Sequence, residues 1–128
     1  NVAISGQDIT IVTVSIALLD AIAAQHELNT KNIYPEIIDL RWLRPLDIDP
    51  IIQSVKKTRR LLVVDTGWRS CSISSEIVAL VAERAHGYLK CPPRRITLPE
   101  APCPASQFLE PYYHPTTETI IQVVKKMV

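Results

Sequence analysis

Four short segments rich in β-branched residues recur along the chain, and a stretch with helical periodicity separates most of them from the next. Inside these segments apolar residues follow one another almost without a break, as in strands buried on both faces of a parallel sheet. Strands that alternate with helices predict an α/β fold: a three-layer α/β/α arrangement around a mostly parallel sheet of about five strands. The expected strands are residues 9–15, 34–40, 60–65 and 94–98.

The stretches between and after these strands carry helix signals. Asp, Ser and Thr side chains accept hydrogen bonds from the free amides of a helix N-terminus, and Gly or Asn favours a helix end. Helices are expected at residues 16–28, from Asp47 or Asp49 to Lys57, from Ser72 to Gly87, and after Thr116 or Thr117.

The longest expected loop, residues 99–115, contains five prolines. A loop of this length is uncommon in a compact domain and indicates a function or an interface. His114 lies in it beside Tyr112 and Tyr113, and a lone histidine in such a place is more typical of a surface or an interface than of a general base.

The length of 128 residues suits one domain with its own core. Because the chain begins with Asn1 rather than Met, we expect it to come from a longer protein. Residues 1–8 are then the remnant of a linker from a missing N-terminal domain, and residues 9–128 are the domain itself.

The net charge and the cysteine content limit the classes of partner and compartment that are expected for this chain. With 14 basic and 13 acidic residues the net charge is +1, so neither nucleic acid nor an anionic membrane is an expected partner. The three cysteines form no CxxC pair, which favours free thiols in a reducing compartment, the cytoplasm or the mitochondrial matrix, over secretion. No metal site is expected, because His26, His86 and His114 lie far apart in the sequence.

Ligands of such folds usually bind where the parallel strands end. After the second expected strand, Arg41 and Arg44 allow two interpretations: an anion clamp, or ion pairs with Asp39 or Asp47 that leave Trp42 at an interface. We favour the ion pairs, because acidic residues flank the segment. Neither GxGxxG nor GxxxxGK[ST] occurs, which argues against nucleotide binding by those loops.

The segment after the third expected strand offers Gly67, Trp68 and several serines ahead of a helix. A helix N-terminus can accept an anion. No GxSxG motif is present and no histidine is adjacent, so a nucleophilic serine is not supported. Capping and packing explain these residues better, and no catalytic residue is expected.

Four segments, taken together, resemble a known family: residues 36–47, 54–58, 65–68 running into 75–77, and 101–104. In this order and spacing they are similar to the C-terminal domain of transketolase-like enzymes. The similarity is closest to the β subunit of the decarboxylase component of pyruvate and branched-chain 2-oxo acid dehydrogenases, which depends on thiamine diphosphate. It extends from about Ile9 to Lys126.

This resemblance implies an assembly domain without catalytic, cofactor-binding or metal-binding residues. The parent enzyme would decarboxylate a 2-oxo acid oxidatively and acylate a lipoyl domain, with thiamine diphosphate and Mg²⁺ held outside this domain. Its expected partners are an α subunit, a second β subunit and a lipoyl acyltransferase. The expected interface residues, mostly aromatic side chains taken to be exposed, are Trp42, Trp68, Lys90, Phe108, Tyr112 and Tyr113.

Lys90 is a departure from the family. Related β subunits often carry an acidic residue at the matching position, where it binds a basic residue of the acyltransferase. A like charge repels such a partner, so Lys90 puts that docking mode in doubt.

Two alternatives remain open. One is a stand-alone α/β module that binds a small anionic ligand near Arg41, Arg44, Gly67 and Trp68. The other is the C-terminal domain of a different transketolase-like enzyme, such as a deoxyxylulose-phosphate synthase or a ferredoxin-linked 2-oxo acid oxidoreductase.

Overall fold

The computed structural model describes the backbone of residues 1–128 and every side chain except that of Pro111. Five strands form one sheet in the order β1-β3-β2-β4-β5. Strands β2 to β5 run parallel to one another, and β1 is antiparallel to its neighbour β3. The strands are β1 (Val2–Ile4), β2 (Ile9–Val14), β3 (Pro35–Leu40), β4 (Leu61–Trp68) and β5 (Arg94–Leu98).

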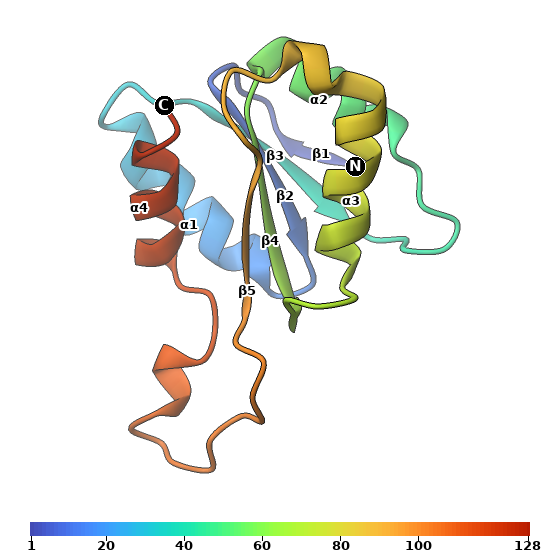
Figure 1. The fold of residues 1–128 in the computed structure, drawn as a ribbon. Coiled ribbons are helices and arrows are strands. Elements are labelled where there is room, and N and C mark those ends of the chain that lie inside the picture. Colours follow the sequence, from blue (N-terminus) through green and yellow to red (C-terminus); the bar gives the residue numbers. More distant parts are fainter.

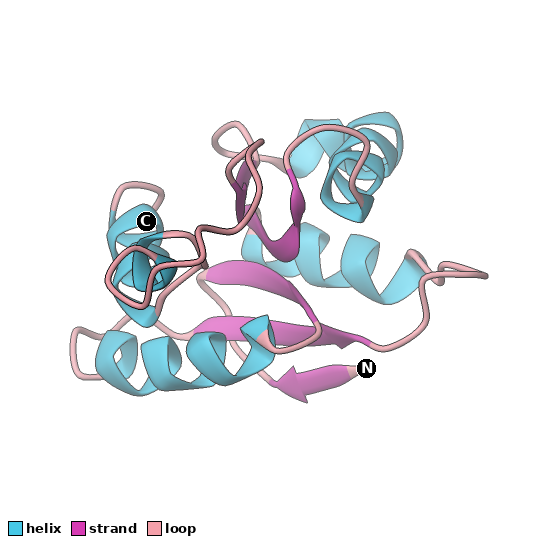
Figure 2. Ribbon diagram, turned by 90° about the horizontal axis from the view of Figure 1, so that it is seen from below, coloured by secondary structure: helices cyan, strands magenta, loops and turns pink.

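Helices cover both faces of this sheet, as the alternating pattern predicted. Figure 1 shows α1 (Ala17–Asn29) and α4 (Thr117–Lys125) on one side, with α2 (Asp49–Thr58) and α3 (Ile73–Ala85) on the other. The view from below in Figure 2 shows the sheet between these two helical layers. Two short 3-10 helices, η1 (His86–Tyr88) and η2 (Glu110–Tyr112), complete the secondary structure. The predicted three-layer fold is confirmed.

The hydrophobic core has two halves, one on each face of the sheet. Ile11 and Leu62 point toward α1 and α4, while Val12 and Val63 point toward α2 and α3, as the alternation of side chains along a strand requires. All four are fully buried. Strands covered on both faces account for the nearly continuous apolar runs in the sequence.

The N-terminal ends of strands β2 to β5 lie together along one side of the sheet. This row of strand ends is called the amino edge below, and it is distinct from the edge strands. There Thr10 Oγ1 hydrogen-bonds Ser54 Oγ at 2.6 Å and Thr58 Oγ1 at 2.7 Å. The buried Glu36 carboxylate accepts hydrogen bonds from Lys57 and from the Gly6 amide. Burial opposes ionisation of Glu36, but hydrogen bonds from Lys57, Ser54 and Gly6 outweigh it and lower its pKa.

Gly6 passes very close to the first residue of β3. A Cβ atom at this position would lie 2.2 Å from the carbonyl carbon of Pro35, far inside a normal contact distance. Close packing against Pro35 therefore requires glycine at this position.

Two expectations about element bounds were wrong. Residues 1–8 are not only a linker, because Val2–Ile4 forms the edge strand β1 and pairs with β3 around Ile37 and Ile38. Such a three-residue strand has too little periodicity to be recognised from sequence alone. The third expected strand continues through Thr66 and Gly67 to Trp68, which were expected in a loop, and Trp68 pairs with Leu98 beyond an irregularity in the register.

No helix among the described residues is both long and apolar enough to cross a membrane.

Candidate functional site

The C-terminal ends of strands β2 to β5 lie together on the opposite side of the sheet from the amino edge. This row of strand ends is called the carboxyl edge below. The chain between β5 and α4 projects from this edge as a long loop (Figure 1). Of the twelve large hydrophobic side chains found exposed in the described chain, seven lie in segments at or directly after these strand ends. They are Ile16, Trp42, Leu43, Trp68, Phe108, Leu109 and Tyr112.

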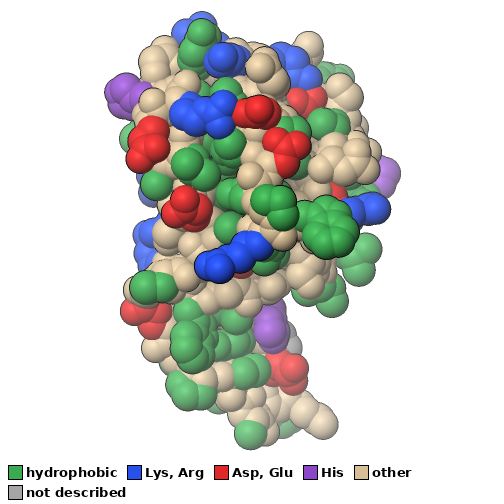
Figure 3. Space-filling model, turned by 90° about the vertical axis from the view of Figure 1, so that its right-hand side faces the viewer, with side chains coloured by type: hydrophobic (Ala, Val, Ile, Leu, Met, Phe, Trp, Pro, Cys, Tyr) green, Lys and Arg blue, Asp and Glu red, His purple; other side chains and the backbone are tan. Residues whose placement is uncertain are grey.

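The most exposed of these side chains belong to the projecting loop. Phe108 and Tyr112 are each 87% exposed, and Trp42 after β3 is 77% exposed. Figure 3 shows hydrophobic side chains gathered on the lower projection of the molecule. Large apolar groups concentrated in this way mark surfaces that bind other proteins.

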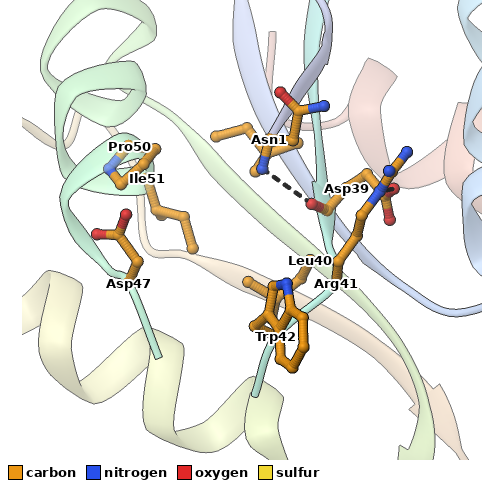
Figure 4. A pocket seen from close by; sticks show the side chains of 9 residues that line it. Asn1, Asp39, Leu40, Arg41, Trp42, Asp47, Pro50 and Ile51 are labelled. Atoms are coloured by element: carbon orange, nitrogen blue, oxygen red, sulfur yellow. Dashed lines mark hydrogen bonds and ion pairs between the residues drawn. The ribbon is translucent and has the colours of Figure 1, made fainter. Parts of the chain in front are cut away.

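A cavity of about 240 Å³ lies beside the end of β3 (Figure 4). Arg41 lines it, but its Nε donates to Asp39 Oδ2 at 2.7 Å, so its charge is already paired. Asp47 adds a second carboxylate to the lining. The cavity is therefore poorly suited to an anion, and the ion pair expected for Arg41 is present.

Arg44 lies elsewhere. It lines a separate open groove with Cys71 and Glu76, between the loop after β3 and helix α3. The structure thus places the two arginines in different cavities.

The N-terminus of α3 is occupied by a side chain of the protein itself. The buried carboxylate of Asp65, in β4, accepts hydrogen bonds from the amides of Gly67 at 2.9 Å and Ser74 at 3.2 Å. Ser72 is the N-cap residue but makes no side-chain capping bond, so the capping expected from the serines ahead of this helix does not form at Ser72. Asp65 supplies the negative charge that the helix favours there, which leaves little attraction for an external anion.

The side chain of Tyr113, near the end of the projecting loop, hydrogen-bonds both the start of the loop and the end of β4. The Tyr113 hydroxyl donates to the carbonyl oxygen of Ala101 at 2.5 Å and accepts from Trp68 Nε1 at 3.1 Å. Tyr113 was expected to be exposed, and that expectation was wrong, because it is only 8% exposed. Its place at an interface stays a prediction. Its partners lie 12 and 45 residues away in the sequence, so no local pattern indicated its burial.

Lys90 lies apart from the other expected interface residues. Its amide donates to the carbonyl oxygen of Arg59, which stands just before β4, so Lys90 is at the amino edge. The expected interface set is thus divided between the two edges: Trp42, Trp68, Phe108 and Tyr112 are exposed at the carboxyl edge, and Lys90 is exposed at the amino edge.

The same loop also brings together three side chains that sequence reasoning did not connect. Cys103, Glu110 and His114 each offer one potential metal ligand atom within 4.8 Å of the others. The expectation that there is no metal site considered only the spacing between histidines, so it did not reveal this group. The usable signal was the spacing of a cysteine, a carboxylate and a histidine within one loop.

The described residues do not fit a diphosphate–Mg²⁺ group. In the cavity beside β3, the guanidinium of Arg41 is committed to Asp39, and Asp47 would repel a phosphate. The N-terminus of α3 already holds the Asp65 carboxylate. We therefore derive no catalytic step from this domain.

Comparisons with known proteins show which family this chain belongs to. The model of the family described as "Transketolase, C-terminal domain" matches residues 1–120. The β subunit of the pyruvate dehydrogenase E1 component of Rickettsia bellii is 42% identical over 122 residues, which cover 95% of this chain and 38% of that protein. The β subunit of acetoin:2,6-dichlorophenolindophenol oxidoreductase of Bacillus subtilis is 38% identical over 122 residues, 95% of this chain and 36% of that protein.

A solved structure described as a split-gene transketolase, an inactive β4 tetramer, has the same fold. It matches with a TM-score of 0.86 over 99% of this chain and 41% of that chain, at 20% sequence identity. The present chain spans well under half the length of the relatives it matches. Because the family model covers nearly all of its residues, the chain belongs to the transketolase C-terminal domain family.

Proposed function

We propose that this chain is the C-terminal assembly domain of the β subunit of a thiamine-diphosphate-dependent 2-oxo acid dehydrogenase. Pyruvate and branched-chain 2-oxo acids are the proposed substrates of the complete enzyme. The similarity to a pyruvate dehydrogenase β subunit supports this assignment. The observation that carries it is the concentration of uncovered apolar side chains at the carboxyl edge.

An assembly role follows from the physical character of that edge. A folded monomer gains nothing from holding Phe108, Tyr112 and Trp42 in water, whereas a partner subunit that covers them gains the free energy of their burial. Trp68 is half exposed and is held by Tyr113. A rigid aromatic side chain of this kind is a good anchor, because little conformational freedom is lost when a partner binds.

The proposed partners are an α subunit and a second β subunit. In this proposal thiamine diphosphate and Mg²⁺ are held by the α subunit and by another part of the β subunit. The enzyme would transfer the acyl group to the lipoyl domain of an acyltransferase.

A second candidate is the β subunit of an acetoin-cleaving enzyme. The acetoin oxidoreductase of Bacillus subtilis is nearly as similar as the pyruvate dehydrogenase relative, at 38% against 42% identity. We place the substrate-selecting residues of either enzyme outside this domain.

The test starts with the intact protein as bait in a lysate of its source, with the recovered proteins identified by mass spectrometry. Recovery of an α subunit supports the assembly role. The purified assembly is then assayed for dye reduction with pyruvate, with branched-chain 2-oxo acids and with acetoin. Activity with a 2-oxo acid supports the first candidate, and activity with acetoin alone selects the second. Recovery of a protein that remains monomeric contradicts both.

A further inference from the structure

We propose that Cys103, Glu110 and His114 form a binding site for a divalent transition-metal ion of the zinc type, in the loop between β5 and α4. This site goes beyond the proposed assembly function, which assigns no role to these side chains. The proposal rests on four features: the positions of the ligand atoms, the way the loop is held, the donor set and the charge of the segment.

The ligand atoms are close enough to share one ion. The Cys103 sulfur, a Glu110 carboxylate oxygen and a His114 ring nitrogen lie within 4.8 Å of one another. A tetrahedral ion with bonds of about 2.0–2.3 Å brings its ligand atoms to separations of about 3.5 Å. All three side chains are exposed, so their rotation can bring the ligand atoms closer together.

The loop is held so that the ligands converge. The Tyr113 hydroxyl bonds the carbonyl oxygen of Ala101, which brings the end of the loop back to its start, two residues before Cys103. The rings of Tyr113 and His114 meet edge to face, with centroids 5.3 Å apart and planes at 87°. This contact limits the directions that the imidazole can take.

Glu110 is positioned by short-range backbone bonds. Its amide donates to the carbonyl oxygen of Ser106 at 2.9 Å, and its own carbonyl oxygen accepts from the Tyr113 amide at 3.0 Å. These bonds define the turn that carries the carboxylate toward His114.

The donor set selects the class of ion. Thiolate and imidazole favour zinc and related borderline ions, whereas Mg²⁺ and Ca²⁺ prefer sets made of oxygen atoms. All three side chains are exposed, so a water molecule or a group from another subunit can complete the coordination.

The charge of the segment also favours a cation. From residue 96 to residue 124 the sequence contains three glutamates and neither lysine nor arginine. An ionised cysteine would add to this negative charge. Because the segment contains no lysine or arginine, no basic residue within it competes with a metal ion for the ligands.

Metal binding would act directly on the proposed interface. Phe108 and Leu109 lie between the first and second ligands in sequence, and Tyr112 lies between the second and third. An ion that joins the three ligands would restrict this exposed apolar stretch before a partner binds it.

The test is a titration of the intact protein, freed of any affinity tag and stripped with a chelator, with Zn²⁺ and with Co²⁺ as a spectroscopic substitute. We expect one equivalent of Co²⁺ to produce near-ultraviolet charge-transfer absorption from a thiolate, and Zn²⁺ to displace it. Cys103→Ser should abolish this absorption. His114→Gln and Glu110→Gln should each weaken binding by at least about tenfold, as removal of a direct ligand implies.

Two control variants carry the same chemical changes at exposed positions outside the cluster: Cys71→Ser and His86→Gln should bind the metal like the unaltered protein. Circular dichroism confirms that every variant is folded. The proposal is overturned if the unaltered protein gives no thiolate absorption with Co²⁺, or if Cys103→Ser retains it.

Discussion

At the amino edge of the sheet, polar side chains satisfy one another, whereas at the carboxyl edge large apolar side chains are left uncovered. Thr10, Ser54 and Thr58 hydrogen-bond in the interior, and Glu36 is paired with Lys57. Phe108 and Tyr112, in contrast, are almost fully exposed. We propose from this difference that the carboxyl edge is covered by another protein, whereas the polar side chains named at the amino edge are paired within this chain.

The largest contrast is expected between Leu61→Ala and Phe108→Ala in the 128-residue chain. Leu61 is fully buried at the start of β4, so its truncation should lower the free energy of unfolding by about 2–5 kcal/mol. Phe108 is 87% exposed, and its truncation should change that free energy by less than about 0.5 kcal/mol. Urea unfolding measures both free energies. Equal losses of stability would contradict the difference proposed between the two edges.

A second contrast concerns two glycines. Gly6→Ala places a methyl group against the backbone of Pro35 and should cost about 1–3 kcal/mol of stability. Gly87→Ala meets no atom within 4 Å and serves as the matched control, with an expected change within about 0.5 kcal/mol. The same unfolding experiment compares them. An unchanged midpoint for Gly6→Ala would show that the turn before β2 can move away.

The pH dependence of stability tests the Glu36 pair. The folded-state pKa of Glu36 is lowered by its hydrogen bonds, so the stabilisation is complete above the ordinary carboxyl pKa of about 4.3 and is lost as the pH falls through the lower folded value. We expect the unaltered chain to lose more stability between about pH 5 and 3 than Glu36→Gln. Parallel curves for the two proteins would show that Glu36 does not contribute.

The smallest effect is expected at Lys90, which is exposed beside Arg59 at the amino edge. If an acyltransferase docks there through a basic domain, Lys90→Glu should increase its affinity severalfold, because a like charge is replaced by an opposite one. Calorimetry with the intact protein measures this, with Lys126→Glu as a control for net charge. An unchanged affinity would place the docking site elsewhere.

Much of the fold was predictable because it depends on local patterns. Apolar runs covered on both faces gave four strands within a few residues of their observed bounds, and Thr116 caps α4 as expected by accepting from the Thr119 amide. Strand β1 was missed because three residues carry almost no periodicity, and its place depends on pairing with β3.

The site was less predictable, since it depends on contacts between distant segments. The exposure of Trp68, Phe108 and Tyr112 was anticipated, and it is confirmed. The burial of Tyr113 was not anticipated, because it comes from hydrogen bonds to Ala101 and Trp68. The grouping of Cys103, Glu110 and His114 likewise requires the loop to fold back on itself.

The central claim is that the carboxyl edge is an assembly surface. The most direct test is the mass of the intact protein in solution, measured by sedimentation with and without its α subunit, for Phe108→Ser/Tyr112→Ser. The control is Tyr34→Ser/Tyr88→Ser, which alters two exposed aromatic residues away from that edge. We predict that the first variant stays folded but loses assembly, whereas the control assembles normally. Normal assembly of the first variant would contradict the claim.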